Sequence, residues 1–203
     1  MKFIKWKSLI ITCVVCLLSI LPGVAVWNNL PDVMAIHFDI NNNPDNFASK
    51  GFVVFAIPLI MVLLQIVCCI INDINSRRFG ERKKFETATK WIIPVMTFLL
   101  QMITIGVGLG WGIDVRKTAA LIVGGVFLVI GNYLPKLDYI KNYDVSTEKA
   151  RKINRFIGFE TVIMGIAFII SIFLPPIATL ACLILMIPYA IIGVAYGVAI
   201  GKK

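Results

Sequence analysis

The sequence predicts an all-α membrane protein, a polytopic bundle of six transmembrane helices with both termini in the cytoplasm. Three observations predict it: an apolar composition, six long apolar runs, and an uneven distribution of Lys and Arg between them. Of the 203 residues, 59% are hydrophobic and 15% are charged, whereas soluble domains average about 45–50% apolar and about 25% charged residues. With a mean hydropathy of +0.87, the chain has more apolar surface than one soluble core would bury.

The six apolar runs have the length that a membrane requires. A helix needs about 20 residues to cross about 30 Å of hydrocarbon, and about 17 is the lower limit. The expected spans are residues 8–27, 52–71, 91–112, 118–134, 156–174 and 177–200. We expect them to form one membrane domain over residues 1–203, with an outer loop at 28–51 and basic inner loops at 72–90 and 135–155.

The basic residues predict the orientation, because Lys and Arg accumulate in cytoplasmic loops. Of 20 such residues, only Lys50, Arg116 and Lys117 fall in the alternate loops, which leaves 17 in the inner loops and terminal segments. The net charge of +9 is therefore a topology signal, and no direct contact with nucleic acid is expected. An alternative interpretation treats residues 1–25 as a cleaved signal peptide. It removes one span and keeps the 28–51 loop outside.

Small residues inside the spans predict close helix packing, because they let helix backbones approach each other in lipid. They are Gly106, Gly108, Gly110 and Gly112 in the third span, and Gly193, Gly197 and Gly201 in the sixth. We expect packing within the bundle, with homodimerisation as the alternative. The five cysteines all lie in apolar runs, where they are expected to act as small hydrophobic residues.

The outer loop holds the only histidine, His37, among several acidic and turn-forming residues. Asp39-x-Asn41-x-Asn43 opens like a calcium-binding loop, but Pro44 replaces the glycine and Lys50 the final glutamate that such a loop needs. One histidine with scattered aspartates is weak support for zinc, and no catalytic motif accompanies it. The sequence therefore predicts no enzyme, no metal and no cofactor. The Asn43–Asn46 turn residues also fit a compact hairpin-like cap.

Only one ionisable residue, Glu160, lies clearly inside an apolar run, and such groups often mark a functional pathway. Glu160 lies near the inner end of the fifth span, where an ion pair with Arg155 or Lys152 is the expected arrangement. The alternative is a buried functional carboxylate.

Two segments resemble a known family. Leu30-Pro31-Asp32-x-x-Ala35-x-His37-Phe38, followed by Pro44-Asp45 and Ser49-Lys50, resembles the first extracellular loop of SdpI-type bacterial immunity proteins and their associated membrane domain. Gly131-Asn132-Tyr133-Leu134-Pro135-Lys136 resembles a helix end in the C-terminal half of that family. Ala35 and Asn43 replace a usual proline and glycine. The inner Gly-Ile-Arg-x-Pro-Trp-Thr element of the family is absent from residues 137–145.

The resemblance implies a multi-pass protein of the bacterial plasma membrane that gives immunity to a toxic antimicrobial peptide, such as a bacteriocin, by binding it. It also implies signalling through sequestration of a cytoplasmic repressor, and membrane lipids are expected partners. Toxin recognition is assigned to the outer-loop residues Pro31, His37, Phe38, Asp45, Ser49 and Lys50. An inner-side structural or partner role is assigned to Asn132, Pro135, Arg155 and Glu160. The alternative functions are a small transporter or channel that uses Glu160, and a membrane enzyme with a metal at His37.

Overall fold

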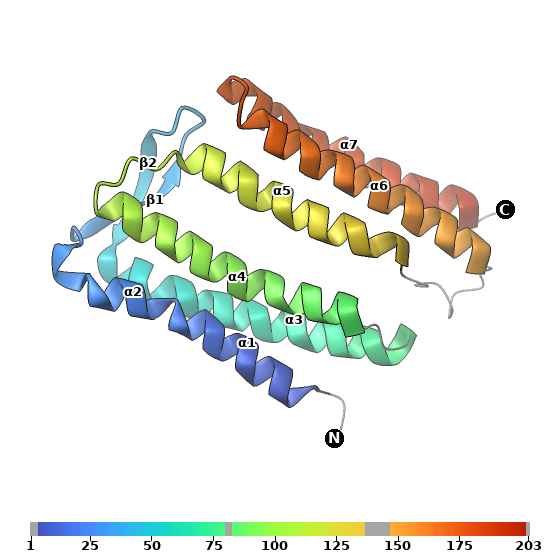
Figure 1. Ribbon diagram of the computed structural model, residues 1–203, viewed down its shortest axis with the longest axis horizontal. Coiled ribbons are helices and arrows are strands. Elements are labelled where there is room, and N and C mark those ends of the chain that lie inside the picture. The colour runs from blue at the N-terminus through green and yellow to red at the C-terminus, as the bar shows by residue number, and fades with distance from the viewer. Residues whose placement is uncertain (1–3, 80–82, 137–146, 202–203) are drawn as a thin grey trace. The chain divides into compact units, whose positions relative to one another are not determined.

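The computed structural model describes residues 4–79, 83–136 and 147–201, and its helices and strands are shown in Figure 1. Six helical segments are long and apolar enough to cross a membrane, as the sequence predicted. They are Trp6–Ala25, Phe52–Arg77, Lys83–Gly108, Val115–Lys136, Arg151–Ser171 and Pro176–Tyr196. The chain is thus a multi-pass membrane protein, whereas the cytoplasmic placement of both termini stays a prediction.

The chain forms two compact units. The elements of the first are α1 (Trp6–Leu18), α2 (Ile20–Ala25), η1 (Trp27–Asn29), β1 (Val33–Phe38), β2 (Pro44–Ser49), η2 (Phe52–Ala56), α3 (Ile57–Phe79) and α4 (Lys83–Gly108). Those of the second are α5 (Val115–Tyr133), η3 (Leu134–Lys136), α6 (Thr147–Ser171) and α7 (Pro176–Gly201). The prediction of a single membrane domain stays a prediction.

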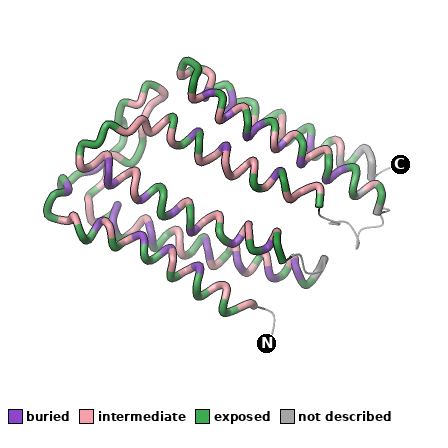
Figure 2. Tube along the Cα trace, viewed as in Figure 1, coloured by how far each residue is buried: buried purple, intermediate pink, exposed green. Residues whose placement is uncertain are grey.

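Helices α3 and α4 are longer than the expected spans, so most of the predicted inner loop 72–90 is helical. Helix α3 continues to Phe79 and α4 begins at Lys83. Eight of the 19 residues in the predicted loop are Lys, Arg or Glu, which are good helix formers. Their charges are solvated where the helices extend beyond the hydrocarbon. Buried positions recur along this extended part, as Figure 2 shows, and they include Asp73, Glu86 and Lys90.

Two glutamine side chains connect α3 and α4 through hydrogen bonds to carbonyl groups that lie near prolines. Pro94 in α4 has no N–H for the carbonyl of Lys90 one turn earlier, and Gln65 Nε2 of α3 donates to that oxygen over 2.9 Å. Pro58 follows the π-helical turn η2, and Gln101 Nε2 of α4 donates to the carbonyl of Val53 there over 3.3 Å. Each helix therefore satisfies a carbonyl near a proline of the other, which explains how these prolines are tolerated within lipid.

The expected third span, 91–112, ends four residues early because α4 terminates in a glycine cap. Gly110 has a φ of +80°, and the N–H groups of Trp111 and Gly110 donate to the carbonyls of Gly106 and Val107. This is the Schellman arrangement, which requires a left-handed residue and therefore favours glycine. Gly106 and Gly108 leave room for Trp111 and for Met34. These glycines thus shape the end of α4 and accommodate the side chains of Trp111 and Met34 within the first unit.

The closest helix packing in the second unit involves glycines that the sequence analysis missed. A Cβ on Gly124 of α5 would lie 2.8 Å from the carbonyl oxygen of Gly165 in α6. A Cβ on Gly131, about two helical turns further along α5, would lie 2.9 Å from the carbonyl oxygen of Gly158 in α6. The two glycines of each helix are seven residues apart, so they fall on one helix face. Their seven-residue spacing was a readable signal in the sequence, whereas the predicted packing in this half of the chain rested on Gly193, Gly197 and Gly201. Of these, Gly193 is buried, with Ile157 3.7 Å from its added Cβ.

Candidate functional site

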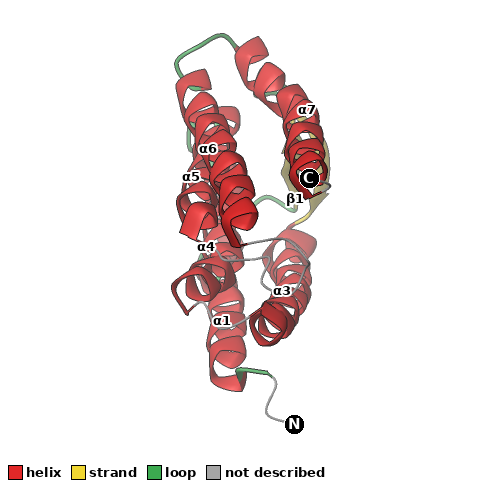
Figure 3. Ribbon diagram, turned by 90° about the vertical axis from the view of Figure 1, so that its right-hand side faces the viewer, coloured by secondary structure: helices red, strands yellow, loops and turns green. Residues whose placement is uncertain are grey.

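The loop 28–51 forms an antiparallel β-hairpin, the only strands in the parts of the chain that the structure describes (Figure 3). The ladder pairs Val33 with Ser49 and Ala35 with Phe47. It then becomes irregular, because Ile36 and Asp45 are extra residues on their strands. Bulges of this kind twist a hairpin and redirect side chains. The hairpin-like cap expected from the turn residues is therefore present, and its bulges set the direction of the side chains near its tip.

The residues that resembled a calcium loop cap the hairpin turn. Asp39 Oδ1 accepts hydrogen bonds from the N–H groups of Asn41 and Asn43, each at 2.8 Å, and Oδ2 accepts one from Asn43 Nδ2 at 3.0 Å. Asn42 has a φ of 67°, a left-handed conformation that asparagine tolerates. The Asn43 side chain, together with the N–H groups of Asn43 and Asn41, holds the pKa of Asp39 below its ordinary value. The Asp-x-Asn-x-Asn pattern is therefore a turn signature here.

We predict that Asp39→Ala loosens the hairpin without unfolding the helices. Because the pKa of Asp39 is lowered in the folded chain, its stabilising effect is present above the unfolded pKa of about 3.9. That effect is lost as the pH falls through the lower folded value. Hydrogen exchange of residues 33–49 should speed up in Asp39→Ala at neutral pH and in the wild type under acid, whereas residues 57–79 keep their protection. Asp45→Ala is the control, and equal exchange in both variants would contradict the capping role.

The hairpin is attached to its unit at two places. At its base, the buried side chains of Met34 and Leu30 pack with Val53, Val54 and Ile105 in one apolar cluster. At its tip, the Asn42 amide donates to the carbonyl of Ile113 over 3.3 Å and accepts from the N–H of Val115 over 2.8 Å. These contacts fix both ends of the hairpin against the end of α4 and the segment that follows it.

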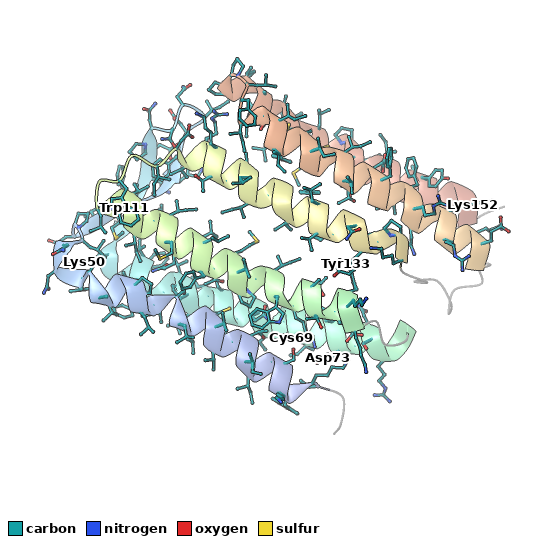
Figure 4. All side chains as sticks on the ribbon, viewed as in Figure 1. Lys50, Cys69, Asp73, Trp111, Tyr133 and Lys152 are labelled. Atoms are coloured by element: carbon teal, nitrogen blue, oxygen red, sulfur yellow. The ribbon has the colours of Figure 1, made fainter. Side chains whose placement is uncertain are left out.

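A cluster of charged and aromatic groups closes the base of the hairpin. The N–H of Lys50 donates to the carbonyl of Asp32 over 2.9 Å, and the two side chains form an ion pair at 2.8 Å. The Lys50 ammonium also lies 5.1 Å from the ring centre of Trp27. The hydrogen bond and charge of Lys50 hold the pKa of Asp32 below its usual range. Lys50 is therefore a structural anchor, and Figure 4 places it at the opposite end of this unit from Asp73.

The predicted recognition residues fall into two groups on the hairpin, one near its tip and one at its base, and their role in recognition stays a prediction. Near the tip, His37 Nδ1 and Asp45 Oδ1 are 2.5 Å apart, and their side chains are 67% and 46% exposed. Phe38 follows His37 on β1. At the base lie Pro31, Lys50 and Ser49, whose hydroxyl accepts the N–H of Phe52 at 3.3 Å. An exposed pair such as His37–Asp45 adds little stability, so its two groups are available to a ligand.

The hairpin also presents apolar side chains that the sequence analysis did not select. Val33 is 60%, Ile36 39% and Phe47 53% exposed. A two-stranded sheet also leaves one backbone edge of each strand without a strand partner. Phe47 lies close to Asp45, Asn46 and Ser49 in the sequence. An aromatic residue in such a polar loop was the available signal for an exposed apolar contact.

A buried ion pair at the other end of the unit was also missed. Lys90 Nζ lies 2.5 Å from Asp73 Oδ1, with side chains only 3% and 2% exposed. The backbone N–H of Lys5 donates to Asp73 Oδ2 over 2.8 Å, and its ammonium pairs with Glu86 at 2.6 Å. This network joins the start of α1 to α3 and α4. Lys90 and Asp73 were assigned to a loop, so their burial was not predicted.

The four residues predicted to have an inner-side role each have different surroundings in the second unit. Asn132 Oδ1 accepts a hydrogen bond from Lys136 at 3.1 Å, and Pro135 packs where Gly158 leaves room. Arg155 is exposed. Glu160 does not pair with Lys152, which instead contacts Glu148 at 2.9 Å. Glu160 Oε2 is buried with no hydrogen-bond partner among the described residues, and it lies 4.0 Å from a Cβ added to Gly193.

The described residues contain no group of three or more His, Cys, Asp and Glu side chains that would hold a metal ion. What the hairpin offers chemically is an anchored surface with one imidazole–carboxylate pair, exposed apolar side chains and strand edges without a strand partner. Such a surface suits binding to a peptide.

One protein-family model matches the hairpin region, and one known protein is similar to a longer part of the chain. Residues 14–62, which contain the hairpin, match the family model described as "Domain of unknown function (DUF1648)". A stretch of 125 residues, 62% of the chain, is 26% identical to "Immunity protein SdpI" of Bacillus subtilis (strain 168) and spans 58% of the length of that protein. No solved structure matches the chain. Both matches agree with the resemblance of this multi-pass plasma-membrane protein to SdpI-type immunity proteins.

Proposed function

We propose that the chain is an immunity protein that protects a bacterial cell by binding a toxic peptide at its outer hairpin. The similarity to Immunity protein SdpI supports this class of function, and the Lys and Arg distribution predicts that the hairpin faces outward. Binding without turnover agrees with the absence of a catalytic motif from the sequence. Sequestration of a repressor, the second role that the resemblance implies, would use the basic inner ends of the helices.

The observation that carries the proposal is the hairpin itself. It is fixed at both ends, yet Val33, Ile36 and Phe47 remain exposed on it. An extended peptide segment would add to an unpaired strand edge through backbone hydrogen bonds, while apolar side chains provide contact area. His37 and Asp45 would then discriminate between peptides by charge and hydrogen bonding, because both side chains reach solvent.

The test is protection of a sensitive bacterium that expresses the chain, challenged with the peptide toxins encoded beside its gene. Wild type should raise the toxin concentration needed for killing, and Phe47→Ser should abolish most of that protection. Phe173→Ser is the matched control, because Phe173 is 83% exposed and lies between α6 and α7, away from the hairpin in sequence. Immunoblots of membranes establish equal expression. Unchanged killing with wild type, or equal protection by the two variants, would contradict the proposal.

A second candidate function is transport, which the buried unpartnered oxygen of Glu160 favours. An ionisable group inside a membrane span is costly to keep there and often marks a transport or proton pathway. If Glu160 lies on a transport path, Glu160→Gln should abolish substrate-dependent flux in liposomes while the protein stays folded. Glu148→Gln, at an exposed position of the same helix, is the control. Full protection from toxin by Glu160→Gln, with no flux by wild type under any gradient, would favour binding alone.

A further inference from the structure

A pocket of about 370 Å³ lies between α1 and α4 in the first unit. Its lining residues are Lys5, Lys7, Ser8, Ile11, Thr12 and Trp91. The pocket lies at the start of the first span, which begins at Trp6. Its lining residues lie before and after the hairpin in the sequence, and none of them is assigned to toxin recognition.

The charges around this pocket leave one ammonium group uncompensated. Lys5 is paired with Glu86, and Lys90 with Asp73, so these four charges cancel in pairs. Lys7 is exposed and forms no ion pair with a described residue. Ser8, which carries a hydroxyl group, lines the same pocket. A cationic group beside a hydroxyl donor suits a phosphate oxygen.

The remaining walls are suited to the boundary of a bilayer. Trp91 is 38% exposed and lines the pocket, and Trp6, 53% exposed, lies between its two lysines in the sequence. Tryptophan is enriched at the level of lipid headgroups. Ile11, 43% exposed, lies one helical turn beyond Lys7 toward the interior of the span, where an acyl chain would pack.

We propose that this pocket is a binding site for the headgroup of an anionic phospholipid. The Lys7 ammonium and the Ser8 hydroxyl bind the phosphate, the Glu86-bound Lys5 adds positive charge, and Trp91 and Ile11 contact the glycerol and the first part of an acyl chain. Basic pockets between transmembrane helices are known to bind such headgroups. The site is independent of the proposed immunity function, because it shares no residue with the hairpin.

The experiment uses the purified full chain in a neutral detergent, with bound lipid measured by native mass spectrometry. The probes are short-chain phosphatidylglycerol, phosphatidylcholine and inorganic phosphate. We expect phosphatidylglycerol to bind more tightly than phosphatidylcholine, and Lys7→Ala to weaken phosphatidylglycerol binding about fivefold. Ser8→Ala should weaken it as well. Lys84→Ala, which removes an exposed lysine outside the pocket, should leave the affinity unchanged.

Three results would overturn the proposal. Equal weakening by Lys84→Ala and Lys7→Ala would show attraction to net charge alone. Equal binding of phosphatidylcholine would show that the anionic headgroup is not recognised. Displacement of the lipid by inorganic phosphate at the same concentration would identify a small-anion site. Melting temperatures without lipid test folding, and Ser8→Ala keeps the test decisive should Lys7→Ala alter the fold.

Discussion

Lys90→Ala is expected to lower the free energy of unfolding by about 3–5 kcal/mol, because it leaves the carboxylate of Asp73 buried without its main partner. Asp73→Ala should have a comparable effect, since Lys90 would then be buried and unpaired. Both side chains are almost fully inaccessible, so water would not replace the lost partner. Unfolding in mixed micelles, followed by circular dichroism, measures the loss.

The double variant Asp73→Leu/Lys90→Met separates the cost of an orphaned charge from the value of the pair. A buried pair replaced by apolar residues of similar size is often neutral in stability, so the double variant should recover most of what either single variant loses. Glu148→Ala is the matched control, because it breaks an exposed Lys–carboxylate pair of similar length. It should change stability little. Additive losses in the double variant would show that the pair does not act as a unit.

Gly124→Leu is expected to disrupt the packing of α5 on α6. Its Cβ would lie 2.8 Å from the carbonyl oxygen of Gly165, and a backbone atom cannot rotate away as a side chain does. Overpacking of this kind costs about 1–3 kcal/mol. Thermal unfolding of the purified protein should show a lower melting temperature.

Gly125→Leu provides a control at the neighbouring position, because nothing lies within 4 Å of a Cβ added there. Leucine is also a better helix former than glycine, so the melting temperature of this variant should stay the same or rise. An equal decrease of the melting temperature in both variants would mean that α5 and α6 do not pack against each other at Gly124.

The sequence predicted the membrane spans well because hydrocarbon thickness fixes their minimum length. The predicted ends of the second and third spans were wrong, because charged residues continue the helices beyond the apolar runs. Lys90 was counted as a loop charge, since a sequence scan cannot show that a partner such as Asp73, on the preceding helix, faces it. Gly110 was assigned to helix packing because glycine supports both a close contact and a left-handed cap, and only the backbone conformation distinguishes them.

At the candidate site, the sequence identified the correct loop and several of its turn residues, but not their grouping. His37 and Asp45 meet because the hairpin has bulges at Ile36 and Asp45, and no pattern in the sequence predicts those shifts in register. The contacts of Lys50 with Asp32 and Trp27 were not predicted, and its role in recognition stays a prediction. Resemblance to the family selected the motif residues and passed over Phe47, which lies outside the motif.

The paired glutamines also restrict how α3 and α4 move against each other. Gln65 reaches from α3 to α4, and Gln101 reaches from α4 to the turn that precedes α3. The two bonded positions, Val53 and Gln65, are about 18 Å apart along the helix axis. A sliding step of one residue would break both hydrogen bonds at once and leave two carbonyls unsatisfied in lipid. These two helices therefore hold a fixed axial register, in which neither can slide along the other without loss of both hydrogen bonds.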